Sequence, residues 1–252
     1  MTKQEALFEF LLRKADDSLI IGHRLSEWCG HGPILEEDIA LTNIALDLIG
    51  QATELYKYAA EVEGKGRNED DLAFLRIERE YKNVLLVEQT NGDFGKTIVR
   101  QFFFDHFEHL LYEGLMNSTD ERISAIATKT IKEIKYHLRH SGEWIIRLGD
   151  GTEESHERVQ ESVNLLARFV DEMFFQNEVD EILIKEGIIP DVREFKAEFD
   201  KNIGDILEEA TLSLPEENYQ MSGGRKGVHS EHLGYLLAEL QYMQRTYPGM
   251  EW

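Results

Sequence analysis

The residues of this chain that could perform metal chemistry are its nine histidines and its 49 Asp and Glu residues. A di-iron centre between four helices needs a carboxylate from each of two helices and a Glu-x-x-His pair from each of the other two. The spacing matters because residues i and i+3 share one face of a helix. The only Glu-x-x-His in the sequence is Glu153 with His156. It follows Thr152 in the predicted first turn of a helix, where acidic residues are favoured, so we interpret it as a solvated helix start.

Histidines also recur three residues apart at three places, a spacing that puts two imidazoles on one helical face. The pairs are His106 with His109, His137 with His140, and His229 with His232. With nine histidines in a helical chain such pairs arise by chance, so we interpret them as surface or hydrogen-bonded core residues. His137 differs from the others because it lies on a regular apolar stripe. We predict that it is a satisfied core histidine.

Two further features could carry other chemistry. The glycine-rich segment 221–227 contains two cations, but it lacks the spacing of a phosphate-binding loop and a preceding strand, so a flexible connection is predicted. Cys29 is the single cysteine and lies near His31, which is a weak signal for a nucleophile. A small packed thiol is the expected state of Cys29. These residues by themselves predict no active site.

The elements that carry these residues are predicted to be long helices. The chain has no proline between Pro33 and Pro190, and a proline inside a helix costs roughly 3 kcal/mol. Apolar residues also recur at i, i+3, i+4 and i+7, the pattern of a half-buried helix. The first three helices are predicted over 4–28, 35–63 and 94–117, with a connection of short helical content over 68–91.

Capping residues mark where the later helices begin. Ser118 with Glu121 matches a capping box and predicts a fourth helix that ends near 148. Thr152 is expected to cap a fifth helix that reaches about 177. Shorter helices are predicted over 179–186, 191–210 and 229–246. Since no segment alternates for long enough to be a strand, we predict an all-α bundle of long antiparallel helices with extra C-terminal helices, in one domain over 1–252.

The net charge of the chain limits the classes of molecule that it is expected to bind. Asp and Glu outnumber Lys and Arg by 49 to 27, a formal net charge of −22. Nucleic acid and anionic membrane surfaces are therefore disfavoured, because their phosphates would be repelled. One cysteine allows no disulfide within the chain, and the N-terminal residues do not resemble a signal peptide. We expect a cytoplasmic protein that does not span a membrane.

Five blocks of the sequence resemble one known family. They are LSEWCGHGP (25–33), NIALDLIGQA (43–52), LLVEQTNGDF (85–94), KEIKYHLR (132–139) and GGRKGVHSEHLG (223–234). In this order they are similar to PaaC, the family of non-catalytic subunits of bacterial phenylacetyl-CoA epoxidase. The blocks run from the first predicted helix to the last, so the resemblance covers nearly the whole chain.

The resemblance implies a ferritin-like bundle that acts beside a related catalytic subunit of the PaaA type. That subunit would carry the di-iron centre and insert one atom of O₂ into the ring of phenylacetyl-CoA. Electrons would come from NADPH through a reductase with FAD and an iron–sulfur cluster, and a small accessory subunit would complete the complex. For this chain the resemblance implies no catalytic residue, no cofactor and no metal.

The resemblance also suggests which positions correspond to the six ligands of a di-iron site. Lys14 stands where the first helix would offer a carboxylate, and Asp105 can stand for the carboxylate of the third helix. On the second helix, Asp47 stands at the Glu position and Gly50 at the His position of the Glu-x-x-His pair, so the imidazole is missing. On the fourth helix, Ile134 stands at the Glu position and His137 at the His position, so the carboxylate is missing. Two carboxylates and one imidazole would remain.

This comparison predicts a vestigial site in which the Lys14 ammonium lies between Asp47 and Asp105. A cation there would replace the positive charge of the irons, which buried carboxylates require. The opposing interpretation is that Asp47 lies on a solvated face. At the level of function, two alternatives stay open: an independently active di-iron oxygenase or oxidase, and a helical protein that binds an acyl-CoA. Whether the segment 221–227 contacts CoA is part of the second alternative.

Overall fold

The computed structural model describes residues 1–216 and 219–250, and within them every regular element is a helix. The α-helices are α1 (Lys3–Ser26), α2 (Leu35–Glu63), α3 (Glu69–Phe74), α4 (Leu85–Glu88), α5 (Phe94–Leu115), α6 (Glu121–Gly149), α7 (Glu153–Leu166), α8 (Glu178–Lys185), α9 (Lys196–Glu209), α10 (Glu231–Leu240) and α11 (Tyr242–Thr246). The predicted all-α fold with long helices and additional C-terminal helices is confirmed. In this part of the chain no helix combines the length and the apolar character needed to cross a membrane.

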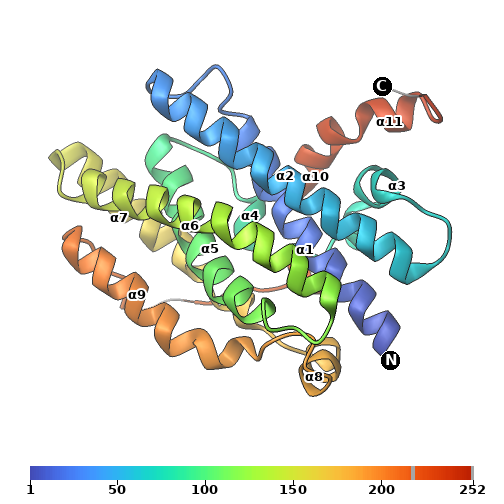
Figure 1. Ribbon diagram of the computed structural model, residues 1–252. Coiled ribbons are helices and arrows are strands. Elements are labelled where there is room, and N and C mark those ends of the chain that lie inside the picture. The colour runs from blue at the N-terminus through green and yellow to red at the C-terminus, as the bar shows by residue number, and fades with distance from the viewer. Residues whose placement is uncertain (217–218, 251–252) are drawn as a thin grey trace.

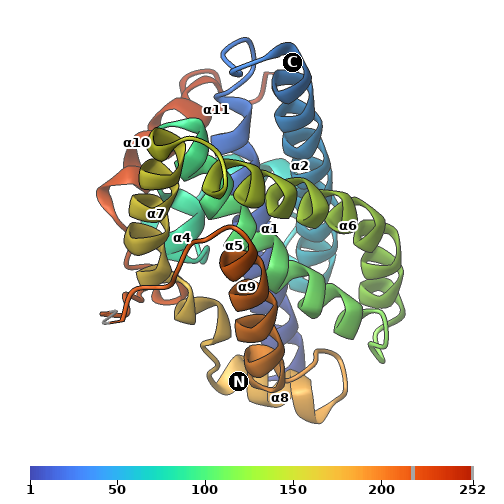
Figure 2. The same ribbon diagram turned by 90° about the vertical axis from the view of Figure 1, so that its left-hand side faces the viewer.

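Four long helices form the bundle, in two consecutive pairs. α1 packs along α2, and α5 packs along α6 (Figure 1). α1 and α5 are buried along most of their length, since apolar side chains surround them on nearly all sides. α2 and α6 bury one stripe each and leave the opposite stripe exposed. Figure 2 shows α2 and α6 toward one side of the molecule, with α7 and α10 on the other. The most completely buried side chains of the bundle therefore come from α1 and α5.

The ends of the helices correct several of the predicted boundaries. The fourth long helix is capped by Asp120, whose carboxylate accepts hydrogen bonds from the backbone N–H groups of Arg122 and Ile123. The predicted capping box at Ser118 is wrong, because its hydroxyl instead donates to the carbonyl of Ile188. Thr152 does cap α7, as expected. α7 ends at Leu166 rather than near 177, and two 3₁₀ turns continue the chain to Phe174.

The segment 221–227 packs against the connection between α2 and α5. Gly227 has φ +73°, and a side chain there would collide with the carbonyl of Arg79. A side chain at Gly224 would collide with the carbonyl of Asn83 in the same way. Glycine is therefore required at both positions for this close approach. The prediction of a flexible connection is wrong for this segment.

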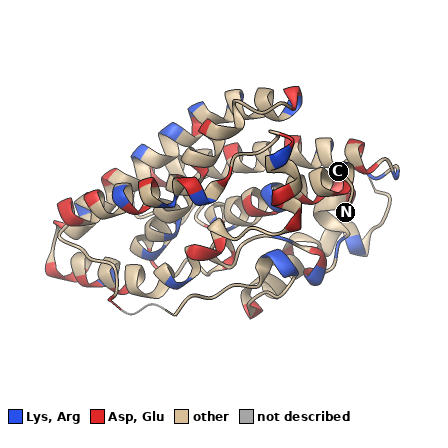
Figure 3. Ribbon diagram, turned by 90° about the horizontal axis from the view of Figure 1, so that it is seen from below, with Lys and Arg blue, Asp and Glu red and all other residues tan. Residues whose placement is uncertain are grey.

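Acidic side chains are distributed over most of the helices rather than gathered in one tail (Figure 3). Several cations are buried instead of exposed, and they are Arg13, Lys14, Arg24, Arg76, Arg100 and Arg225. A buried charge needs a partner, and five of these cations bind a carboxylate. The buried cations are thus largely neutralised inside the protein, and the acidic surface follows from the net charge of −22.

Candidate functional site

Lys14 lies in the centre of the molecule with 3% of its surface exposed. Its Nζ donates to Asp17 at 3.0 Å and to Glu108 at 2.5 Å. The ammonium also lies over the rings of Phe104 and Phe107, at 5.9 and 5.3 Å from their centroids. Two carboxylates and two aromatic faces thus stabilise a cation that has left water.

These partners correct the prediction for Lys14. The lysine is buried among carboxylates, as expected, but the carboxylates are Asp17 and Glu108 instead of Asp47 and Asp105. The reason is helical spacing. Asp17 lies one turn after Lys14 on α1, and Glu108 lies one turn after Asp105 on α5, so each shares a helical face with a residue of the predicted site.

A guanidinium from the C-terminal part of the chain completes this cluster. Arg225 binds Asp17 with both terminal nitrogens, at 3.0 and 2.7 Å, and Asp17 also accepts from the backbone N–H of Val84. Burial alone would raise the pKa of Asp17, but the charges of Arg225 and Lys14 hold it below its ordinary value. Burial raises the pKa of Glu108, against the opposing effect of Lys14. We call Lys14, Asp17, Glu108 and Arg225 the central ion cluster.

Asp105 belongs to a second group of polar residues, on the side of α6. Its carboxylate accepts from the Gln101 amide at 2.5 Å and from the Ser141 hydroxyl at 2.8 Å. Burial raises the pKa of Asp105 to about 7, although His137 and both hydrogen bonds act in the opposite direction. His137 is 2% exposed, and its Nε2 lies 3.1 Å from the carboxylate of Asp47. His137 is therefore a satisfied core histidine, as predicted.

Asp47 and Gly50 lie at the outer edge of the bundle. The Asp47 side chain is 35% exposed and pairs with His137, so it is neither buried beside Lys14 nor simply solvated. Gly50 is exposed, and a methyl group placed there would meet nothing within 4 Å. The inward positions with i, i+3 spacing on α2 are Leu48 and Gln51, whose amide donates to the hydroxyl of Tyr112. The predicted register on α2 is wrong by one residue.

The inward side chains do not fit two irons. Each long helix presents two of them, one turn apart: Lys14 and Asp17, Leu48 and Gln51, Asp105 and Glu108, Ile134 and His137. A di-iron site needs four carboxylates and two imidazoles, whereas these positions supply three carboxylates, one imidazole, one amide, a cation and two aliphatic side chains. Among the described residues no group of three or more His, Cys, Asp and Glu is arranged to hold a metal ion.

A hollow of about 360 Å³ opens between α2 and α6 beside Asp47 and Gly50. Acidic Glu54 and Glu133 line it together with basic Lys129. Burial, followed by the charge of Asp47, raises the pKa of Glu133. Salt bridges tie the two helices at either side of the hollow, one between Arg122 and Glu61 and one between His140 and Glu37. The hollow combines both signs of charge and is not an apolar ligand pocket.

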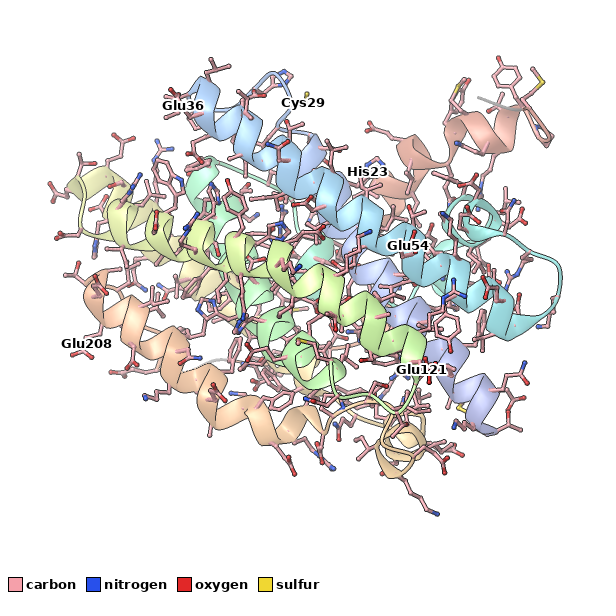
Figure 4. The ribbon with its side chains drawn as sticks, viewed as in Figure 1. His23, Cys29, Glu36, Glu54, Glu121 and Glu208 are labelled. Carbon is pink, nitrogen blue, oxygen red and sulfur yellow. The ribbon has the colours of Figure 1, made fainter. Side chains whose placement is uncertain are left out.

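The other candidates from the sequence have structural roles. His106 and His156 each bond a backbone carbonyl, and His229 bonds the buried carboxylate of Glu88. Cys29 is exposed in the turn after α1 (Figure 4), which contradicts the expected packed thiol. In the segment 221–227, Arg225 is buried on Asp17 and is therefore not available to a phosphate.

Sequence reasoning missed Asp17, Glu108, Gln51, Ser141 and Arg225. The first two could have been found from spacing, because each lies three residues after a residue already singled out. Arg225 had no such signal. Its contact with Asp17 joins residues 208 positions apart, and nothing local predicts a contact of that range.

Comparison with known proteins gives two consistent results. The whole chain, residues 1–252, matches the family described as "Phenylacetic acid catabolic protein" (PaaA_PaaC). The chain is also 48% identical over 246 residues to the C component of 1,2-phenylacetyl-CoA epoxidase from Escherichia coli (strain K12). That alignment covers 98% of this chain and 99% of the relative. The resemblance inferred from the five sequence blocks is confirmed.

Proposed function

Because this chain belongs to the phenylacetic acid catabolic protein family, we propose that it is the non-catalytic, PaaC-type component of a 1,2-phenylacetyl-CoA epoxidase complex. The observation that carries the proposal is the similarity to the C component of that epoxidase, at 48% identity. The similarity covers 98% of this chain and 99% of the relative, so it is not confined to one shared segment. The complex would oxidise the aromatic ring of phenylacetyl-CoA in the degradation of phenylacetate.

In this proposal the chain supports a related catalytic subunit and performs no oxidation itself. The PaaA-type partner would hold the di-iron centre, and a reductase with FAD and an iron–sulfur cluster would pass electrons from NADPH. Lys14 and Ile134 stand at positions where a carboxylate would otherwise bind metal, which supports a vestigial site. The charge and aliphatic bulk at those positions favour rigid support over metal binding.

The two alternative functions have less support. An independently active di-iron oxygenase would need ligands that the inward positions lack. A stand-alone protein for acyl-CoA would need exposed cations for the phosphates, whereas Arg225 is engaged by Asp17. The surface is also acidic, and CoA is polyanionic.

Metal analysis and reconstitution test the proposal together. The chain expressed alone with added iron should contain no stoichiometric iron and should not consume O₂ with phenylacetyl-CoA. Co-expression with the PaaA-type subunit should give one complex on size exclusion, with iron in the partner and with activity once the reductase and accessory subunit are added. Close to two irons per chain, or separate elution of the two subunits at micromolar concentration, would refute the non-catalytic role.

A further inference from the structure

The segment 221–230, which we call the strap, donates hydrogen bonds to three buried carboxylates of the bundle. These carboxylates belong to three different elements: α1, α4 and the 3₁₀ turn Asp171–Phe174. Because the chain reaches the strap only near its end, these contacts all join residues far apart in sequence. The donors and acceptors are Gly223 with Glu172, Arg225 with Asp17, and both His229 and Ser230 with Glu88.

His229 differs from the other donors of the strap because an imidazole gains or loses its charge near neutral pH, whereas a guanidinium and a backbone N–H do not. Both of its ring nitrogens face an acceptor. Nδ1 lies 2.9 Å from the carboxylate of Glu88, and Nε2 lies 3.0 Å from the carbonyl oxygen of Tyr81. A carbonyl oxygen can only accept a hydrogen bond, so Nε2 carries a proton.

The surroundings of Glu88 place a proton on Nδ1 as well. One carboxylate oxygen accepts from the backbone N–H of Ser230 at 2.6 Å, and the other accepts from the amide of Asn83 at 3.0 Å. Donors on both oxygens match the ionised carboxylate, which accepts the Nδ1 proton of His229. The side chains of His229 and Glu88 are both 0% exposed. The contact is therefore a buried pair of an imidazolium and a carboxylate.

Two further charged residues near this pair come from α1. Arg24 donates to the backbone carbonyl of Glu88, and Asp16, which binds Arg76, adds a negative charge that favours the imidazolium. Burial alone would lower the pKa of His229. The hydrogen bond and charge of Glu88, with smaller effects of the Tyr81 carbonyl and Asp16, nevertheless hold that pKa above its ordinary value of 6.5.

We propose that the strap is a pH-sensitive closure of the central ion cluster, held shut by the protonated imidazole of His229 and opened when that proton passes to water. A neutral imidazole has one N–H, so either Glu88 or the carbonyl of Tyr81 would be buried without its donor, which is unfavourable. Arg225 lies four residues before His229 on the same strap, so opening also withdraws its guanidinium from Asp17. The closure concerns this chain alone and does not rest on the proposed function.

The direction of the pH dependence follows from the two states of His229. In the open strap its pKa should be close to 6.5, and in the closed strap it is higher. The contribution of the pair to closure is therefore complete below pH 6.5 and is lost as the pH rises through the pKa of the closed state. Between these two values the equilibrium constant for opening should rise by up to about tenfold per pH unit, since opening releases one proton.

Hydrogen exchange of the full chain between pH 6 and pH 9 tests the closure. The readout is the protection factor, which corrects for the ordinary rise of exchange with pH, at the backbone amides of Gly223, Val228 and Ser230. These amides should lose protection as the pH rises, whereas those in the middle of α5 should not.

A matched pair of variants assigns the effect to His229. His229→Gln has a neutral side chain at every pH, so its strap should be less protected at pH 6 and should lose the pH dependence. The control is His31→Gln, which changes an exposed histidine in the turn after α1 and should behave as the unmodified chain. Protection of the strap that does not change with pH in the unmodified chain, or that changes equally in His229→Gln, would overturn the proposal.

Nitrogen NMR of the imidazole rings tests the charge of His229 without any variant. Both ring nitrogens of His229 should be protonated at pH 6.5, and the midpoint of its titration should lie above that pH. The resonances of the strap amides should change over the same pH range. A neutral His229 ring at pH 6.5 would overturn the proposal even if the variants fail to fold.

Discussion

The central ion cluster and the pair of Asp47 with His137 both place charged side chains within the bundle, but they differ in their exposure to water. In the cluster, Lys14, Asp17, Glu108 and Arg225 are all at most 8% exposed and share their charges. Asp47 is one-third exposed and holds a single buried imidazole at the edge of a hollow. The first region is closed to water and the second is open. Removing one partner of a closed pair is therefore expected to cost much more stability than removing one partner of the partly solvated pair.

The largest expected effect comes from breaking the closed cluster. Lys14→Ala leaves Asp17 paired with Arg225 but removes the cation from the buried carboxylate of Glu108, and breaking a buried pair in this way typically costs about 3–5 kcal/mol. Urea unfolding measures the loss, with the slope checked for two-state behaviour. The matched control is Lys3→Ala, since Lys3 is an exposed lysine of the same helix.

Replacement of both charges separates electrostatics from packing. Lys14→Met combined with Glu108→Leu should recover most of the lost free energy, because an apolar pair of similar volume needs no compensation. A loss of less than about 0.5 kcal/mol for Lys14→Ala would be that of an ordinary surface substitution and would contradict the buried cluster.

The second expected effect is a pH dependence that arises from Asp105. Burial raises the folded-state pKa to about 7, above its ordinary value of 3.8, so the folded state retains a proton that the unfolded state has lost. The contribution of Asp105 to the free energy of unfolding therefore falls as the pH rises between those two values. The free energy of unfolding of Asp105→Asn should therefore rise relative to that of the unmodified protein, by about 1.4 kcal/mol for each unit of pH increase between 3.8 and about 7. Urea melts at pH 5 and pH 7 give the comparison, and parallel curves for both proteins would contradict it.

A smaller effect is expected at the open pair. Asp47→Asn keeps a hydrogen-bonding group beside His137 and removes a charge that is partly solvated, so the loss should be about 1 kcal/mol or less. The measurement is the same unfolding experiment. A loss as large as that of Lys14→Ala would show that the two regions do not differ as described.

The smallest effect should have the opposite sign. Gly50 is inside α2, and a methyl group there meets no atom within 4 Å. Gly50→Ala should therefore raise the free energy of unfolding by about 0.5–1 kcal/mol through helix propensity and a less flexible unfolded chain. Thermal melts report the change. Destabilisation would mean that the edge of α2 is less open than its geometry indicates.

Helices are predictable from this sequence because their signals are local. The bounds of α2 agree with the prediction at both ends, since the apolar stripe and the turn at Gly64 are set by neighbouring residues. The prediction makes α7 too long because the apolar pattern continues through the 3₁₀ turns up to Phe174. Periodicity does not distinguish those turns from the end of an α-helix.

The polar site is only partly predictable. The spacing rules find the inward faces of α1, α5 and α6, but a register error of one residue on α2 selects Gly50 in place of Gln51. The partners of Lys14 also depend on which of several carboxylates reaches the ammonium, and that depends on how the helices are rotated. Such rotation results from packing across the whole bundle and is therefore not predictable from a local stretch of sequence.

The ion pair between Asp17 and Arg225 also affects when the first helix can be buried during synthesis of the chain. A ribosome that adds about 5–20 residues per second needs roughly 10–40 seconds to travel from the codon of Asp17 to that of Arg225, 208 positions later. During this interval Asp17 and Glu108 would share the single ammonium of Lys14, and enclosing two carboxylates with one cation would be unfavourable. The nascent first helix should therefore stay open until synthesis is nearly complete. Chains stalled before residue 225 should be cut by protease within α1, and released full-length chains should resist.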